Sequence, residues 1–253
     1  MRQWFLGVAV VIAASSAAVA DEKAEAIVKK GIDSHGGADA LSKNMASRFT
    51  LKGEVDVQGT DTEFTGDMAY VVPGRFKMNL NLEVMGMKIS INQVINGEKA
   101  KRMVKVGDMV IKQEVEQEDL KMGAAGQAAQ KLTPLLDPKV FSIRAADDED
   151  VNGKKAAVVI ATPKAIDKEI KLYFDKESGL LVKTGHKGLG PGDGGARAEV
   201  YKETYLSEYK KVNGVQVPTK MVLNHDGKKF MTATMGDYEV LEKIDDKEFS
   251  VED

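Results

Sequence analysis

The sequence predicts a mainly β fold, in which a curved antiparallel sheet forms an unclosed β-barrel with helices packed in its concave side. Apolar and charged residues alternate with a period of two over most of the chain, as in strands that bury one face. Asn-Gly, Asp-Gly and Pro-Gly pairs recur between these segments and are typical of hairpin turns. About eleven or twelve such strands make a sheet roughly 50 Å wide, and a sheet of that width tends to curl. Two helical regions, each about 10 Å across, cover only part of its apolar face.

Residues 1–20 are predicted to be a secretory signal peptide. Arg2 is followed by an apolar run and by small residues that end in Ala18-Val19-Ala20, the usual form of a cleavage site. The run is too short to span a bilayer comfortably. We therefore expect a periplasmic or secreted protein with one domain over residues 21–253. Because the chain has no Cys, this domain must be held by a buried core and not by disulfides.

Helical spacing occurs at two places. Residues 21–43 predict a helix, a break at Gly36-Gly37 and a short second helix. One apolar stripe of the first helix is formed by Ala24, Ile27, Val28 and Ile32. Residues 116–133, rich in Ala and Gln, predict a further helix. Gly123 and Gly126 each cost it about 1 kcal/mol relative to Ala, so we expect this helix to be held weakly.

The period of two begins at Arg48 and continues through both halves of the chain. Residues 76–84 alternate without a fault, and Asn96-Gly97 closes the hairpin that follows. The acidic run at residues 147–150 is interpreted as a solvated turn. The other main predicted strands are residues 140–146, 155–162, 169–175, 196–211, 215–224 and 230–241.

Methionines crowd the middle third of the chain, and several of them fall on the predicted inner face. Met is flexible and polarizable, so it suits an adaptable binding surface, but it also fills gaps in ordinary cores. From the sequence, a packed interior and an apolar cavity both remain open. If there is a cavity, the helix at residues 116–133 is its candidate lid. The candidate ligand-binding residues are Met78, Leu80, Leu82, Val84, Met85, Met87, Ile91 and Met122.

Sequence motifs do not indicate catalysis, a metal or a cofactor. Gly190–Gly195 matches G-x-G-x-x-G in letters, but that fingerprint needs a strand before it and a helix after it, so we interpret it as a hairpin loop. His35, His186 and His225 are predicted to lie in solvated loops. The net charge of −3 is interspersed along the chain, which argues against a nucleic-acid partner.

Three sequence segments in the second half of the chain are characteristic enough to suggest a family. They are the hairpin sequence of residues 172–183, the segment Tyr209-Lys210-Lys211-Val212-Asn213-Gly214-Val215-Gln216-Val217-Pro218, and the closing residues 238–249. Over about residues 150–253, they resemble the outer-membrane lipoprotein-sorting, LolA/LolB-like, periplasmic proteins. That resemblance implies an unclosed antiparallel β-barrel, helices that plug its opening, and an apolar cavity for acyl chains.

The function we expect is therefore a non-enzymatic protein that binds lipid or lipoprotein acyl chains, as a monomer with transient membrane contact. Two alternatives remain. With a filled core, the same fold would act as an envelope protein-interaction or sensor module. A secreted hydrolase would need a convergent acid–base or metal cluster in a cleft.

Overall fold

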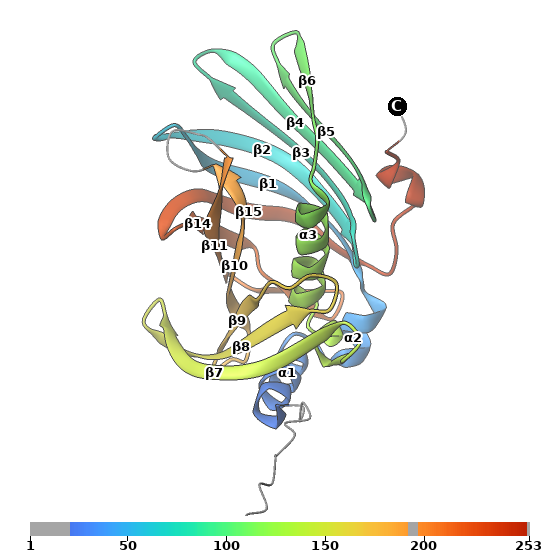
Figure 1. Ribbon diagram of the computed structural model, residues 1–253, viewed down its shortest axis with the longest axis vertical. Coiled ribbons are helices and arrows are strands. Elements are labelled where there is room, and N and C mark those ends of the chain that lie inside the picture. The colour runs from blue at the N-terminus through green and yellow to red at the C-terminus, as the bar shows by residue number, and fades with distance from the viewer. Residues whose placement is uncertain (1–20, 192–196, 252–253) are drawn as a thin grey trace, which may run out of the picture.

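The structure, a computed structural model, describes residues 21–191 and 197–251. It confirms the predicted fold class, because 13 strands form one antiparallel sheet that curves without closing, with helices against its concave side (Figure 1). The predicted signal peptide at residues 1–20 and most of the predicted Gly-rich loop, from residue 192, lie outside the described residues. In the part of the chain that the structure describes, no helix is long and apolar enough to cross a membrane.

The first half of the sheet is a meander, in which each strand pairs with the next along the chain. Its strands are β1 (Ala46–Val57), β2 (Thr60–Val71), β3 (Arg75–Val84), β4 (Met87–Asn96), β5 (Lys99–Val106) and β6 (Met109–Gln113). Val84 and Met87 form the last pair of the β3–β4 hairpin. Met85 and Gly86 make its two-residue turn with φ angles of 51° and 76°, the left-handed conformation that such hairpins require.

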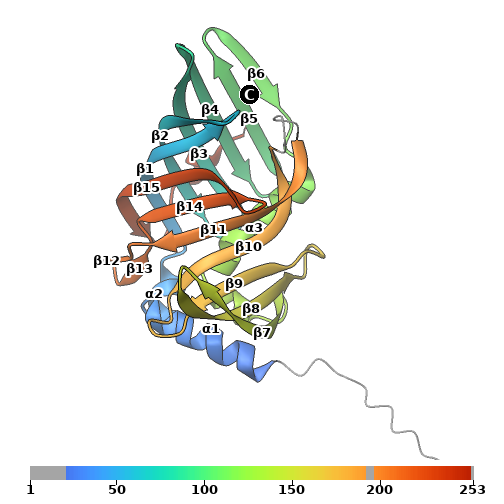
Figure 2. The ribbon, with the colours of Figure 1, turned by 90° about the vertical axis from the view of Figure 1, so that its left-hand side faces the viewer.

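The second half of the sheet returns to the first strand. Its strands are β7 (Phe141–Val151), β8 (Lys154–Pro163), β9 (Ile170–Asp175), β10 (Leu181–Pro191), β11 (Arg197–Ser207), β14 (Lys220–His225) and β15 (Lys228–Leu241). Strand β15 pairs with β1, so the last strand joins the two halves of the sheet (Figure 2). Strands β12 (Lys210–Val212) and β13 (Val215–Val217) form a separate two-stranded ribbon.

The helices lie where the sequence predicts them. Asp21 caps α1 (Glu22–Ser34) by accepting a hydrogen bond from the Ala24 backbone N–H at 3.1 Å. Helix α2 (Ala38–Lys43) follows after the break at the two glycines. Helix α3 (Gln117–Gln130) and the short 3₁₀ helix η1 (Thr133–Leu136) lie between the two halves of the sheet, and a second 3₁₀ helix, η3 (Asp246–Phe249), follows β15 (Figure 1).

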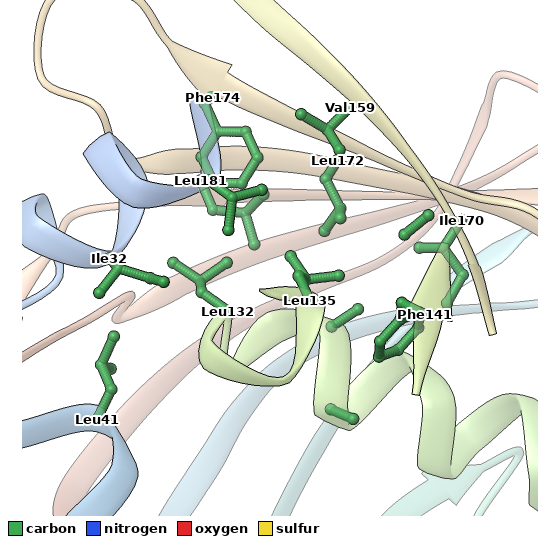
Figure 3. Close-up of a cluster of buried hydrophobic side chains, with 14 of the residues drawn as sticks. Ile32, Leu41, Leu132, Leu135, Phe141, Val159, Ile170, Leu172, Phe174 and Leu181 are labelled. Carbon is green, nitrogen blue, oxygen red and sulfur yellow. The ribbon is translucent and has the colours of Figure 1, made fainter. Parts of the chain in front are cut away.

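One part of the concave side is filled. The main core cluster joins α1, α3 and η1 to strands β7 to β10, and its largest fully buried side chains include Leu132, Leu135, Phe141, Leu172 and Leu181 (Figure 3). Burying each such side chain stabilises the fold by about 1.5–3 kcal/mol. This cluster anchors the end of α3 and η1 to the β7–β10 part of the sheet.

Two expectations for the second half of the chain were wrong. The acidic run at residues 147–150 is not a turn but part of β7, with a register shift between Ala146 and Glu149. Its carboxylates are held by lysines of the neighbouring strands and turn: Asp148 with Lys176 at 2.5 Å, Asp150 with Lys155 at 2.9 Å and Glu149 with Lys171 at 3.4 Å. The predicted strand at 215–224 is divided at Pro218 into β13 and β14, because Pro cannot donate to a sheet ladder.

Candidate ligand-binding cavity

A cavity of about 900 Å³ lies between α3 and the two facing walls of the half-barrel. Strand register determines its walls, because paired residues point to the same face of a sheet. On one wall, Phe76 pairs with Ile95 and Met78 with Gln93, and Gln93 in turn pairs with Arg102. On the other wall, Lys202 of β11 pairs with His186 of β10 and with His225 of β14. Helix α3 covers the cavity with Asp119, Leu120, Met122, Gly123 and Gln127.

A smaller chamber of about 250 Å³ lies deeper, against the central strands, and is mostly apolar. Its apolar walls include Phe49, Leu51, Met68, Leu206, Met221 and Met235. Phe76 and Gln127 line both the chamber and the larger cavity. The two spaces are therefore neighbours, one apolar and one with a partly charged wall.

Aromatic side chains form one end of the chamber. The Phe49 and Tyr238 rings stack with centroids 4.8 Å apart, and the hydroxyls of Tyr70 and Tyr238 lie 3.5 Å apart. Burial raises the pKa of Tyr238 well above its usual value, so this phenol stays neutral. Lys131 also lines the chamber; its ammonium donates to the Asn44 carbonyl at 2.8 Å and lies 5.4 Å from the centre of the Tyr70 ring, so this charge has partners within the protein.

The larger cavity has a polar row across β10, β11 and β14. Burial lowers the pKa of His186 to about 4, and the nearby Lys202 and Lys168 charges contribute to this shift, so the imidazole is neutral at pH 7. Burial also lowers the pKa of Lys202 and that of His225. Glycines make room for this row: a Cβ atom on Gly190 would lie only 3.1 Å from His225 Cε1.

His35 has a different role from the other two histidines. Its Nδ1 donates to the Gly31 carbonyl at 2.7 Å, and its Nε2 accepts from the Leu181 backbone N–H at 3.5 Å. Burial lowers its pKa, although the Gly31 hydrogen bond opposes this effect. His35 thus joins the end of α1 to β10, which is a structural task.

The structure brings only some of the predicted ligand-binding residues together. Met78 and Met122 line the larger cavity. Leu80 and Ile91 pair on the inner face of β3 and β4 and are half-buried. Leu82 pairs with Ile89, and both border a different hollow, of about 1470 Å³, that is lined mainly by polar residues.

The remaining predicted residues lie at the tip of the β3–β4 hairpin. Met85 is 94% exposed and Met87 51% exposed, and Val84 is half-buried beside them. They lie outside both cavities because the two-residue turn carries them past the end of the covered sheet face. The alternation of apolar and polar residues over 76–84 shows which face of the strand is apolar. It does not show how much of that face α3 covers.

Sequence reasoning missed the polar residues of the cavity. His186 and His225 were predicted to lie in solvated loops, which is wrong: both lie in strands, and His225 is only 9% exposed. The signal was present in the period of two, because Met221, Leu223 and His225 share one face of β14. The same count places Lys202 on the apolar face of β11, between Val200 and Thr204. Among the residues described, no group of three His, Cys, Asp or Glu could hold a metal ion.

Comparisons with known proteins agree with this architecture. The sequence matches no protein-family model, and no curated protein matches it significantly. A DUF1329 family protein from Desulfovibrio piger is similar in structure, with a TM-score of 0.52 and 12% identity over 90% of this chain and 97% of that one. A putative outer membrane lipoprotein-sorting protein domain from Vibrio parahaemolyticus has a TM-score of 0.50 and 12% identity over the same shares of the two chains. A LolA superfamily protein from Nitrosomonas europaea follows at 0.49 and 10%, again covering 90% and 97%.

At these identities the likeness shows the fold. The chain thus has an unclosed β-barrel fold similar to that of the Vibrio parahaemolyticus protein, with a cavity beneath its helix α3. The resemblance inferred from the sequence phrases is confirmed at this level.

Proposed function

We propose that the protein is a non-enzymatic binding protein that holds an acyl chain, from a lipid or a lipoprotein, inside its half-barrel. The observation that carries the proposal is the apolar chamber of about 250 Å³ beside the cavity of about 900 Å³. Small-molecule sites are commonly clefts of about 300–1,000 Å³ with mostly apolar walls and a few polar groups. The flexible Met68, Met221 and Met235 of the chamber suit chains of varied shape.

The compartment belongs to the same proposal. Residues 1–20 are removed on export, and residues 21–253 act as one domain in the periplasm or outside the cell. The leader pattern around Ala18-Val19-Ala20 supports this. So does the likeness to a structure described as a lipoprotein-sorting domain. The protein works as a monomer and contacts the membrane transiently, when the acyl chain enters or leaves.

The filled part of the interior supports the alternative of a protein-interaction or sensor module. Side chains of the main core cluster fill the concave side beneath strands β7 to β10. The cavities, however, lie between α3 and strands β1 to β6, β10, β11, β14 and β15. The acyl-binding function is favoured because two neighbouring cavities, of about 900 and 250 Å³, remain open beside this core.

The test is to produce the protein with its leader in a bacterial periplasm, purify it without detergent and identify co-purifying lipids by mass spectrometry. We expect an acyl species near one per protein. Thr204 lines the chamber and Thr234 is exposed on β15, so Thr204→Trp should displace the lipid and Thr234→Trp should not. A protein that carries no lipid and does not bind a fluorescent fatty acid would instead indicate the interaction module.

A further inference from the structure

Two half-buried cations of the 900 Å³ cavity, Arg102 and Lys202, have no carboxylate partner among the residues that the structure describes. Arg102 points inward from β5 and Lys202 from β11, on the facing walls. Neither forms an ion pair within 4.0 Å with a carboxylate of the described residues. The nearby Arg197 is different, because its guanidinium is paired with Asp119 of α3. Glu114 also lines the cavity but is exposed.

Several polar atoms beside these cations also lack partners. In the described part of the chain, Arg102 Nε and both ring nitrogens of His225 are buried without a hydrogen bond, as is Gln127 Oε1. The Arg102 and Lys202 charges repel each other and are repelled by Arg197, with Asp119 as the opposing charge. A buried donor or charge without a partner destabilises a fold. This cluster therefore lowers the free energy of unfolding of the protein when no ligand occupies the cavity.

An anion from outside the chain would supply the missing partner. A guanidinium donates in a planar fork that matches carboxylate and phosphate oxygens, and an ammonium adds a compact point charge. Hydrogen bonds of this kind are stronger in a cavity that is shielded from water. The remaining wall, from Phe76 into the chamber, is mostly apolar, which suits a hydrocarbon chain attached to that anion.

We propose that the cavity selects amphiphiles with a compact anionic headgroup, a carboxylate or a phosphate monoester, which Arg102 and Lys202 bind while the hydrocarbon chain enters the apolar chamber. This inference rests on the proposed acyl-binding function and adds the chemical class of the headgroup. His225 and Gln127 face the same space and supply further polar contacts. The salt bridge between Arg197 and Asp119 lines the cavity beside α3.

Calorimetric titration of the delipidated full-length mature protein tests the proposal. The probes are dodecanoic acid, dodecyl phosphate and dodecan-1-ol, which share one chain and differ in the headgroup. The variants are Arg102→Gln, Lys202→Gln and, as a matched control, Lys105→Gln, whose lysine is exposed on the opposite face of β5. Thermal unfolding of each unliganded variant is measured in parallel.

We expect at least one anionic probe to bind the unaltered protein about tenfold or more tightly than the alcohol. Arg102→Gln and Lys202→Gln should each remove most of that preference and leave alcohol binding nearly unchanged, whereas Lys105→Gln keeps it. A preference for the acid or for the phosphate identifies the source of the anion. The unliganded Gln variants should unfold at an equal or higher temperature, because an unpaired buried charge is removed. If Arg102 and Lys202 had a purely structural role, their Gln variants would unfold at a lower temperature than the original protein.

The two proposals fail in different ways. If the alcohol binds as tightly as both anionic probes, headgroup selection is overturned and acyl binding stands. If the preference survives in both Gln variants, the roles of Arg102 and Lys202 are overturned and acyl binding again stands. If none of the three probes binds, acyl binding is overturned and headgroup selection with it.

Discussion

At the scale of single residues, burial decides which charges this protein carries in its interior. His186 and Lys202 are paired across β10 and β11 and face the same cavity. The free energy of placing a charge in this space lowers the pKa of both side chains. The histidine responds by staying neutral at pH 7. The pKa of Lys202 is lowered from its usual value, first by burial and then by the nearby Arg197 and Arg102 charges, while Asp119 opposes this shift.

This difference predicts a pH dependence of stability. His186 has a pKa of about 4 in the folded protein, against the usual value of 6.5 for a free histidine side chain. Below pH 6.5 the unfolded chain therefore binds a proton that the folded protein does not, and the free energy of unfolding falls as the pH is lowered from 6.5 towards 4. We expect His186 to lower the free energy of unfolding by about 2 kcal/mol between pH 7.5 and pH 5. Denaturant unfolding at pH 7.5 and pH 5 measures it, and a His186→Gln variant that loses as much would contradict it.

A fluorescent reporter can be placed in the chamber without background. The only Trp of the chain is Trp4, in the predicted signal peptide, so residues 21–253 contain none. Phe49 lines the chamber, and Phe49→Trp should emit at short wavelength and shift when a fatty acid is added. Tyr201→Trp, on the other face of β11, is the control and should not respond. Equal responses from both variants would show that the lipid binds outside the chamber.

At the scale of the elements, α3 forms the helical wall of the 900 Å³ cavity. Its buried face carries mostly small side chains, namely Leu120, Met122, Ala125, Ala128 and Ala129. Few large side chains and two internal glycines mean that the helix gains little from packing and from its own propensity. This supports the expectation, made from the sequence, that α3 is held weakly enough to move as a lid.

Stiffening α3 should therefore slow the exchange of ligand. A Cβ atom added at Gly123 or Gly126 meets nothing within 4 Å, so alanine fits at both positions. We expect Gly123→Ala with Gly126→Ala to raise the free energy of unfolding by about 1–2 kcal/mol and to slow release of a fluorescent fatty acid in stopped flow. Ala26→Gly in the exposed side of α1 is the opposite control, which should lower stability and leave release unchanged. Unchanged release from the stiffened helix would mean that the ligand leaves by another route.

At the scale of the whole molecule, the sequence determines the sheet better than the cavity. Local patterns such as Asn96-Gly97 and the alternation over residues 76–84 predict strands and turns because the information is contained in adjacent residues. The cavity depends on distant pairs, since β1 meets β15 and the Lys202 row faces Arg102 only after the sheet curls. The spacing of neighbouring residues does not show which residues of distant strands face each other. For this reason Met85 was predicted to line the cavity, and Lys202 was not predicted as a cavity residue.

The C-terminal segment covers part of the outer face of the first half of the sheet, over β1 to β4. Phe249 of η3 is fully buried against Ala46, Ala69 and Val71 of β1 and β2. The segment is further held by ion pairs, Asp246 with Arg75 and Glu248 with Arg48. Because this cluster lies on the side of the sheet opposite the chamber, its contribution to stability should be separable from ligand binding.

Phe249→Ala should accordingly lower the free energy of unfolding by about 3–4 kcal/mol, the usual cost of truncating a buried Phe. Fatty-acid affinity, measured at a temperature where the variant is folded, should stay within about twofold of the original protein, because both cavities keep their walls. Ile111→Ala on edge strand β6, where the side chain is 41% exposed, is the control and should cost less than about 1 kcal/mol. If affinity falls together with stability in Phe249→Ala, the C-terminal segment also determines the curvature of the sheet. The cavity would then depend on how tightly η3 is packed against β1 to β4.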